Sequence, residues 1–142
     1  MPVLCECRSD RRWMSPFSPE LAALRAGRIM LEQIREHVRK GESFAFETTM
    51  SGRIYLQKIP RWQSEGYIVK LFFLQLPSPE MAIARVRQRV AAGGHNIPES
   101  VIRRRFDAGL HNLTHFYKML VDEWVLYDNS GDEPVLLKEG SK

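Results

Sequence analysis

The feature of this sequence that could most directly do chemistry is a cluster of six arginines. They are Arg85, Arg87, Arg89, Arg103, Arg104 and Arg105. Only one carboxylate, that of Glu99, lies among them. Guanidinium groups match phosphate oxygens bidentately, so arginines with few acids to pair with indicate a clamp for an anion. A solvated basic face is the alternative interpretation, and most charge runs are of that kind.

Two predicted helices carry these arginines, and a glycine break joins them. Arg85 and Arg89 are four residues apart, so they share a helix face. Gly93–Gly94 ends the first helix, because glycine adopts a positive φ at little cost. Pro98 at the first helical position and Glu99 near the positive dipole end begin the second helix. The stretch therefore predicts two arginine-bearing helices folded over a hinge.

Length and composition predict one soluble globular domain. The chain has 142 residues, of which 44% are hydrophobic and 27% are charged, enough for one core and too few for two. No apolar run is long enough to span a membrane. Cys5 and Cys7 are too close for an ordinary disulfide, so we expect a reducing, cytoplasmic location. The net charge of +4 suits an anionic small substrate or nucleic acid and does not distinguish them.

Strands and helices alternate along the rest of the chain. Amphipathic spacing predicts helices that begin at Ser18-Pro19, near Arg53, at Ser78-Pro79 and after Pro98. In each serine–proline pair the serine is the expected N-cap and the proline the first helical residue. In the last helix the apolar residues recur at spacings of three and four, so this helix is expected to be long and to dock against the core; they are Ile102, Phe106, Leu110, Leu113, Tyr117 and Leu120. Strands are predicted at Ser43–Thr48, Tyr67–Leu76, Trp124–Asp128 and Pro134–Lys138. The first is a continuous apolar run expected to be buried on both faces, and the last is expected at an edge. The predicted fold is α/β, with a mainly parallel sheet flanked by helices.

Polar residues follow two of these strands, where ligands bind in parallel sheets. Glu47, Thr48 and Thr49 end the first strand and could hold a polyol or a metal-bound water; capping the next helix is the alternative. Asp128–Ser130 ends another strand, so we expect both groups and the arginines to meet at one sheet edge.

Histidines offer two further candidates. His95 lies in the hinge and could donate to a phosphate, or could be a simple turn residue. His111 and His115 have the spacing of a zinc-binding pair, but no third ligand is identifiable and Asn112 stands where a glutamate is expected. We therefore expect two solvent-exposed histidines and no metal site.

Four segments together carry a family resemblance. They are FAFETTMSGR (Phe44–Arg53), RVRQRVAAGGHNIPE (Arg85–Glu99), IRRRF (Ile102–Phe106) and LYDNS (Leu126–Ser130). In this order they resemble the bacterial zeta-toxin-like P-loop kinases, a group also described as predicted ABC-type ATPases. The resemblance extends from about Ser15 to the C-terminus.

The resemblance implies a nucleotide-kinase-like sandwich that uses ATP and Mg²⁺ to phosphorylate a small hydroxyl acceptor, such as UDP-N-acetylglucosamine. Arg89, Arg104 and Arg105 are the expected catalytic residues, neutralising the transferring phosphate. The expected substrate-binding residues are Glu47, Thr48, Thr49, Arg53, Arg85 and His95. Asn129 is expected to bind the nucleotide, and an antitoxin protein is an expected partner.

The sequence departs from the family at its beginning. It contains no G-x-x-x-x-G-K-[ST] motif and no strand ending in Asn-x-Asp, so the phosphate loop and the catalytic aspartate are absent. We therefore expect an incomplete domain at residues 15–142, truncated at its N-terminus, that binds ATP weakly and is inactive. Residues 1–14 are expected to be disordered and without a strand. Read one base later, codons for Glu6–Met14 can encode Asn-Ala-Asp-Leu-Ile-Ala-Ala-Gly, which suggests a frameshift.

The absent strand has a structural consequence. In nucleotide-kinase-like sheets it would lie between Ser43–Thr48 and Tyr67–Leu76. Without it, those two strands are expected either to pair directly or to expose open edges.

Two alternatives to a kinase domain come from other functional classes. One is a basic module that binds nucleic acid, but no aromatic residue lies between Arg85 and Arg105 to stack on bases. The other is a non-catalytic interaction protein, which exposed core faces would favour. No membrane partner is expected.

Overall fold

The chain forms two compact units, Met1–Glu47 and Thr48–Lys142. The structure is a computed structural model that describes residues 3–4 and 19–142. The predicted boundary between Met14 and Ser15 lies outside the described residues. No helix in these ranges is long and apolar enough to cross a bilayer.

The first unit contains one long helix and a short parallel strand pair. Helix α1 (Pro19–Lys40) starts at the predicted proline and ends at Gly41, whose φ is +68°. Strand β1 (Val3–Leu4) pairs with β2 (Phe44–Ala45). The prediction of no strand in residues 1–14 is therefore wrong at Val3–Leu4. The prediction that the next strand is buried on both faces is also wrong, because Phe44 is half-buried and Ala45 is exposed.

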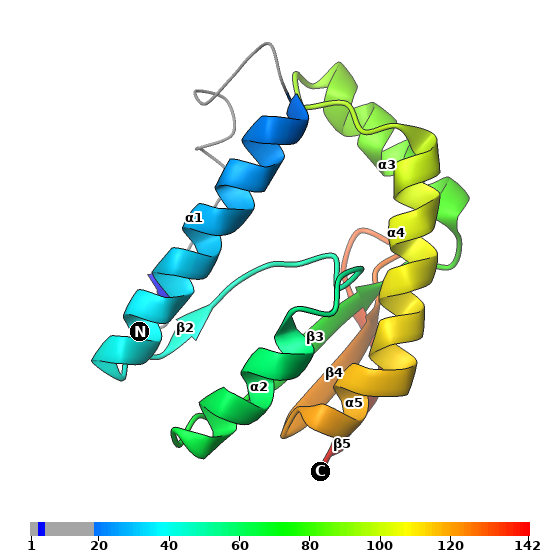
Figure 1. Cartoon of the computed structure of the whole chain (residues 1–142). Coiled ribbons are helices and arrows are strands. Elements are labelled where there is room, and N and C mark those ends of the chain that lie inside the picture. Colours follow the sequence, from blue (N-terminus) through cyan, green and yellow to red (C-terminus); the bar gives the residue numbers. More distant parts are fainter. Residues whose placement is uncertain (1–2, 5–18) are drawn as a thin grey trace. The chain divides into compact units, whose positions relative to one another are not determined.

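The second unit alternates helices with a three-stranded sheet (Figure 1). Its elements are α2 (Tyr55–Ser64), β3 (Lys70–Gln75), α3 (Pro79–Ala91), α4 (Glu99–Asn112), the π-helical segment η2 (Leu113–Tyr117), α5 (Lys118–Leu120), β4 (Glu123–Asp128) and β5 (Val135–Ser141). The strand order is β3-β4-β5, with β3 parallel to β4 and β5 antiparallel to it. The α/β class is confirmed, but the sheet is mixed rather than mainly parallel, because the chain turns back directly from β4 into β5.

Each strand beside the predicted gap has a partner within its own unit. Among the described residues, β2 pairs with β1, and β3 pairs with β4. The fourth predicted strand, β5, lies at an edge as expected.

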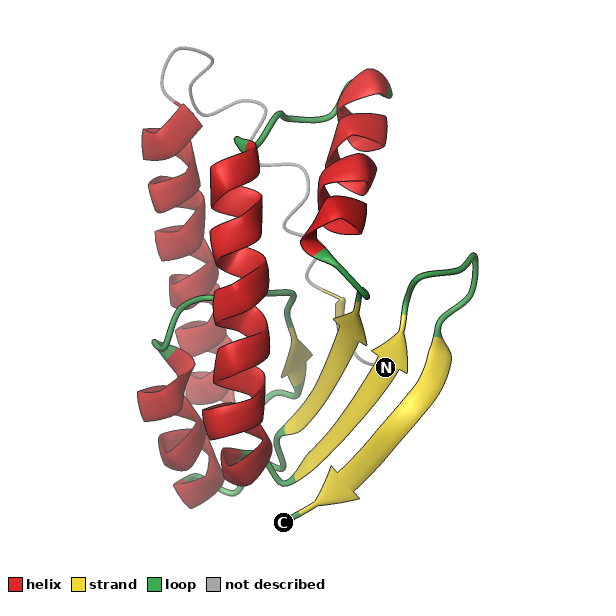
Figure 2. Cartoon of the chain, turned by 90° about the vertical axis from the view of Figure 1, so that its right-hand side faces the viewer, coloured by secondary structure: helices red, strands yellow, loops and turns green. Residues whose placement is uncertain are grey.

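The long helical stretch α4–η2–α5 covers one face of the sheet (Figure 2). Its buried residues follow the predicted spacing, with Ile102, Leu113 and Tyr117 at most 8% exposed. Leu126 of β4 is also buried, and the ammonium of Lys118 lies 4.3 Å from the ring centre of Trp124. The burial of these apolar side chains stabilises this unit through the hydrophobic effect.

A carboxylate fixes the base of the sheet. The two side-chain oxygens of Asp122 accept hydrogen bonds from the backbone N–H of Val69 at 2.7 Å and from Nε2 of Gln63 at 3.1 Å. The Val69 bond, with help from Gln63, lowers the pKa of Asp122. These two hydrogen bonds join the beginning of β3 to α2 and β4. The carboxyl end of β3 lies at the opposite end of the strand, beside α3 and α4.

Candidate anion-binding site

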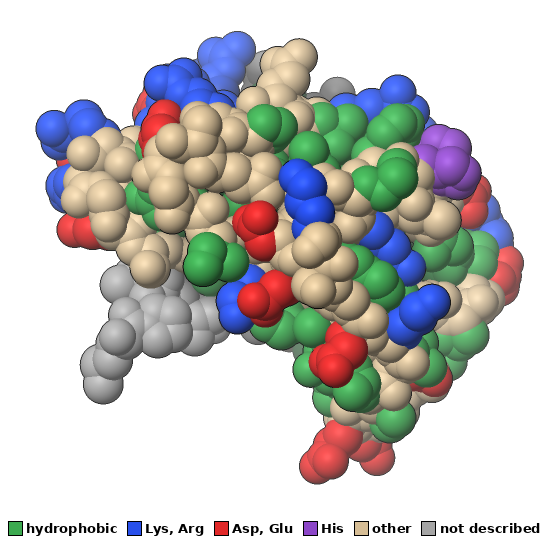
Figure 3. Space-filling model, turned by 90° about the horizontal axis from the view of Figure 1, so that it is seen from below, with side chains coloured by type: hydrophobic (Ala, Val, Ile, Leu, Met, Phe, Trp, Pro, Cys, Tyr) green, Lys and Arg blue, Asp and Glu red, His purple; other side chains and the backbone are tan. Residues whose placement is uncertain are grey.

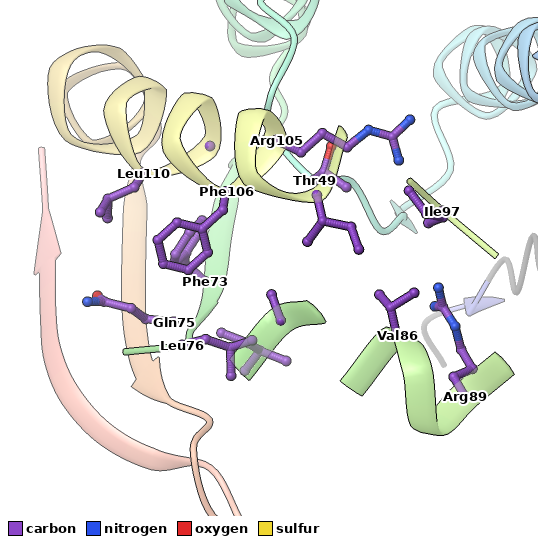
Figure 4. Close-up of a pocket in the computed structure, with 14 residues that line it drawn as sticks. Thr49, Phe73, Gln75, Leu76, Val86, Arg89, Ile97, Arg105, Phe106 and Leu110 are labelled. Carbon is purple, nitrogen blue, oxygen red and sulfur yellow. The ribbon is translucent and has the colours of Figure 1, made fainter. Parts of the chain in front are cut away.

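An apolar cavity of about 290 Å³ lies between α3, α4 and the carboxyl end of β3. Phe73, Phe106 and Leu110 line it on one side, and two arginines and Thr49 also line it. In Figure 4, Arg89 from α3 and Arg105 from α4 lie toward the same end of the cavity as Ile97. Phe73 and Phe106 lie toward the other end. The cavity therefore combines apolar walls with two cations, a surface suited to an amphipathic anion.

The end of α3 places Arg89. Helix α3 begins with Ser78, whose Oγ accepts from the Met81 N–H at 3.3 Å, and with Pro79 at the first helical position, as predicted. It ends where the Gly94 N–H bonds to the Arg89 carbonyl at 2.8 Å and the Gly93 N–H to the Val90 carbonyl at 2.9 Å. This pair of bonds is the Schellman arrangement.

Both glycines of the hinge are required by this geometry. Gly93 has a φ of +87°, a conformation that residues with a Cβ avoid. A Cβ on Gly94 would lie 2.6 Å from the carbonyl oxygen of Arg89. The predicted break is confirmed, and it fixes the backbone of the residue that faces the cavity.

The second helix begins one residue later than predicted. Pro98, with a φ of −55° and a ψ of 139°, is the N-cap residue, and α4 starts at Glu99. The Pro98 carbonyl accepts from the N–H groups of Val101 and Ile102. The reason is that the extended ψ keeps Pro98 itself outside the helix.

Three of the six arginines have partners within the protein. Arg85 donates to the backbone carbonyl of Asn129, and Arg87 pairs with Glu99. Arg103 pairs with Glu80 at 2.6 Å, which lowers the pKa of the Glu80 carboxyl. We call these three the engaged arginines. The carboxylate of Glu80 lies outside the cluster in sequence, so the expectation of a single acid partner was incomplete.

The other three arginines have no ion pair or hydrogen bond among the described residues. We call Arg89, Arg104 and Arg105 the unengaged arginines. Arg105 is half-buried, whereas Arg89 and Arg104 are exposed, and Arg104 does not line the cavity. The structure thus brings two of the three predicted catalytic arginines to one cavity.

The loop before α2 contributes Thr49 to the same cavity. Helix α4 approaches this loop so closely that a Cβ on Gly109 would lie 2.7 Å from the Thr49 carbonyl oxygen. The next residue, Met50, is 4% exposed and has a φ of +53°, unusual for a residue other than glycine. Such conformations persist only where the surroundings hold them, and they are frequent at functional sites.

Two side chains hold the loop in place from the helix. Asn112, 3% exposed, donates from Nδ2 to the Met50 carbonyl at 2.9 Å. The hydroxyl of Tyr117 donates to the Gly52 carbonyl at 3.0 Å. The Thr49 and Ser51 hydroxyls are 2.9 Å apart, and the Thr48 hydroxyl accepts from the Met50 N–H at 3.2 Å. Thr48 therefore supports its own loop, and Thr49 is the hydroxyl at the cavity.

Several other predicted site residues lie elsewhere. Arg53 donates to Oδ1 of Asn112 at 3.3 Å and lies 4.7 Å from the ring centre of Phe116, so it is part of the loop anchor. Asn129 bonds through its backbone to Gln75 and Arg85. His95 is exposed and does not line the cavity. Glu47 belongs to the first unit and is exposed.

The histidine pair is exposed, as expected. The rings of His111 and His115 stack with centres 4.2 Å apart, and Nδ1 of His115 is 2.9 Å from the His111 carbonyl. The described residues contain no group of three or more side chains that could hold a metal ion.

Sequence reasoning missed the residues that shape the site. Phe106 and Leu110 were predicted as core residues, yet they are half-buried cavity walls. Asn112, Gly109 and Met50 were not singled out at all. Asn112 gave no signal that could have revealed it, because it lies outside the apolar spacing of this helix.

Comparison with known proteins gives one significant relative. It is a Haemophilus influenzae protein described as uncharacterized, 29% identical over 93 residues, which are 66% of this chain and 66% of that protein. The match spans slightly less than two thirds of the relative's length. No protein-family model matches the chain, and no solved structure matches it significantly.

Proposed function

We propose that this chain binds a small amphipathic anion in the cavity between α3 and α4. The observation that carries the proposal is that Arg89 and Arg105 line an apolar cavity and have no carboxylate partner among the described residues. A guanidinium group beside apolar walls interacts more strongly with an anion than it does in open water, because the local dielectric is lower. The phosphate of a nucleotide sugar fits this combination of charge and apolar surface.

The finer form of this proposal is that the chain is the acceptor-binding part of a zeta-toxin-like kinase domain. In that assignment Arg89 and Arg105 meet the phosphate groups, and Thr49 meets the acceptor. The residues present do not fit ATP and Mg²⁺, since the sequence has no phosphate-loop motif and the described residues have no metal-capable cluster. We therefore propose binding of the acceptor, such as UDP-N-acetylglucosamine, without turnover.

A small ligand is favoured over nucleic acid by the direction of the aromatic side chains. Base stacking requires an exposed aromatic face next to the basic groups. Phe73 and Phe106, the aromatic residues at this site, both line the cavity. A single strand of RNA would find phosphate contacts here but no exposed stacking platform beside them.

Isothermal titration calorimetry with UDP-N-acetylglucosamine, ATP and single-stranded RNA tests the proposal. We expect the nucleotide sugar to bind most tightly, and Arg89→Ala or Arg105→Ala to weaken it about tenfold to a hundredfold. Arg104→Ala is the matched control, because it removes the same charge from a residue outside the cavity.

The pattern of losses decides between the interpretations. If all three substitutions weakened ligand binding equally, the arginine cluster would be a general basic surface and not a specific site. Preferential binding of RNA would replace the small-ligand proposal with the nucleic-acid one.

A further inference from the structure

Asn112 is a buried amide at the end of α4, and each end of that amide faces a complementary group. Nδ2 donates to the Met50 carbonyl at 2.9 Å, and Oδ1 accepts from Nε of Arg53 at 3.3 Å. An amide has distinct donor and acceptor ends, so the two contacts together fix its orientation. Turning the amide over would place two acceptors together at Met50 and two donors together at Arg53.

Helix α4 contacts two successive loop residues from two successive turns. Gly109 lies three positions before Asn112 and so shares its helix face. The backbone of Gly109 approaches the carbonyl of Thr49, and the side chain of Asn112 bonds to the carbonyl of Met50. The helix therefore holds Thr49 by close packing and Met50 by a hydrogen bond.

The bend at Met50 determines where Thr49 lies. The left-handed backbone of Met50 is unfavourable for a residue with a side chain, so it needs contacts that hold it. The bond from Asn112 acts on this residue directly. Across the bend, the hydroxyls of Thr49 and Ser51 are 2.9 Å apart. If Met50 relaxed to a negative φ, the chain would change direction there and Thr49 would turn relative to the cavity that it lines.

We propose that Asn112 is a positioning residue for the ligand, which acts through Met50 to keep the Thr49 hydroxyl at the cavity. Asn112 does not line the cavity itself, so its effect on the ligand is indirect. Tyr117 is the second anchor of the same loop, through the Gly52 carbonyl. This inference rests on the proposed function, in which Thr49 meets the acceptor.

An indirect role makes a specific demand on pairs of substitutions. If Asn112 affects the ligand only through Thr49, its substitution has nothing left to remove once the Thr49 hydroxyl is gone. The two losses of affinity should then fail to add, as expected for residues that act through one contact. A general loss of structure would instead weaken binding in either background.

Isothermal titration calorimetry of the full chain with UDP-N-acetylglucosamine tests this demand. Asn112→Leu removes the amide with little change in side-chain size and none in charge, and Thr49→Val removes the hydroxyl. Each should weaken binding about fivefold to tenfold, the usual effect of one lost hydrogen bond. The double variant should bind about as weakly as Thr49→Val alone.

Gln63→Met is the matched control, because Gln63 makes the same kind of contact at the other end of the sheet. Its Nε2 donates to the Leu120 carbonyl at 2.9 Å. Figure 3 views the molecule from the side on which α2 and α5 lie in Figure 1, and basic, acidic and apolar side chains are mixed on the face it shows. Gln63→Met should lower the melting temperature and leave the affinity unchanged.

Tyr117→Phe is a milder variant that tests the loop even if Asn112→Leu does not fold. It removes the hydroxyl that bonds to Gly52 and keeps the buried ring. We expect binding about twofold to fivefold weaker, and no further change beside Thr49→Val.

The outcomes separate this inference from the proposed function. Losses that add to that of Thr49→Val, equal weakening by Gln63→Met, or native affinity in the loop-anchor variants would each overturn the inference while ligand binding stands. A native chain that did not bind the nucleotide sugar would overturn the proposed function, and the inference with it.

Discussion

Two sets of three arginines occupy the same 21-residue stretch and have opposite surroundings. The engaged arginines hold elements together: Arg85 reaches the turn after β4, and Arg87 and Arg103 join α3 to α4 through acids on the other helix. Among the described residues, the unengaged arginines touch no carboxylate. The difference teaches that a basic cluster is not one functional unit, because three of its arginines make contacts within the protein and three do not.

The largest expected effect comes from changing the glycine that fixes Arg89. Gly94→Ala places a Cβ 2.6 Å from the Arg89 carbonyl oxygen. Since the contact is with backbone, the helix end must move, and we expect a loss of about 1–3 kcal/mol of unfolding free energy. Ligand binding should weaken as well, because Arg89 moves with its backbone.

Thermal denaturation followed by circular dichroism measures this loss. Gly131→Ala is the control, since the nearest atom to its added Cβ is the Glu133 carbonyl oxygen at 4.0 Å. If Gly94→Ala melted like the native chain and bound the nucleotide sugar equally well, Gly94 would not be what fixes the position of Arg89.

A smaller effect is expected from an engaged arginine, and it should depend on pH. Arg103 lowers the pKa of Glu80. A carboxyl with a lowered pKa in the folded state stabilises that state above its unfolded pKa, and the contribution disappears as pH falls through the lowered value. Arg103→Ala should therefore lower the melting temperature at neutral pH and lose this effect in acid.

Melting curves of the native chain and Arg103→Ala at a series of pH values measure the difference. Both residues are at the surface, so the change should be less than that of Gly94→Ala. A difference in melting temperature that stayed constant from pH 7 to strong acid would show that Arg103 acts by packing and not through Glu80.

The smallest expected effect is that of Arg87→Ala. Its ion pair with Glu99 is exposed, with side chains 73% and 51% accessible. Such pairs contribute about 0–1 kcal/mol. We expect a nearly unchanged melting temperature and unchanged binding of the nucleotide sugar in calorimetry. A loss of binding comparable to that of Arg89→Ala would move Arg87 from the engaged set to the ligand-facing set.

Local signals in the sequence predicted the elements well. Ser78-Pro79 started α3 and the glycine pair ended it, because capping depends on neighbouring residues alone. The apolar spacing from Ile102 onward predicted which face of α4 docks. The first two strands were predicted too long, since β2 spans two residues and β3 six. The last two were predicted too short, since β4 spans six residues and β5 seven. Strand extent depends on the neighbour across the sheet, which a single strand's sequence does not contain.

The candidate site was predictable only in part, because residue types can be read from the sequence but contacts between distant residues cannot. Arg89, Arg105 and Thr49 were selected by residue type and expected to converge, and they line one cavity. The sequence could not separate Arg105 from Arg104, since adjacent helical residues differ only in which side they face. It also could not show that Arg103 reaches Glu80, 23 positions away. The fold alone decides such pairings.

The π-helical segment η2 has a consequence for insertions and deletions. Asn112 and Tyr117 both reach the loop at residues 50–52, although they are five positions apart. Five residues of regular α-helix would turn the second side chain by about 140° from the first. The wider π turn, closed by the bond from the Lys118 N–H to the Leu113 carbonyl, removes most of that offset.

Whether both anchors reach the loop therefore depends on the number of residues between Asn112 and Tyr117. Deleting one residue within Leu113–Phe116 would leave a regular helix in which Asn112 and Tyr117, then four positions apart, still share a face. Inserting one residue instead would rotate Tyr117 by about a further 100°, away from Gly52. The loop would then keep one of its two helix anchors, and Met50 would lose support for its left-handed backbone. The same insertion within residues 130–133 would lengthen only an exposed turn. Relatives that position this loop in the same way should tolerate insertions at the turn and not in η2.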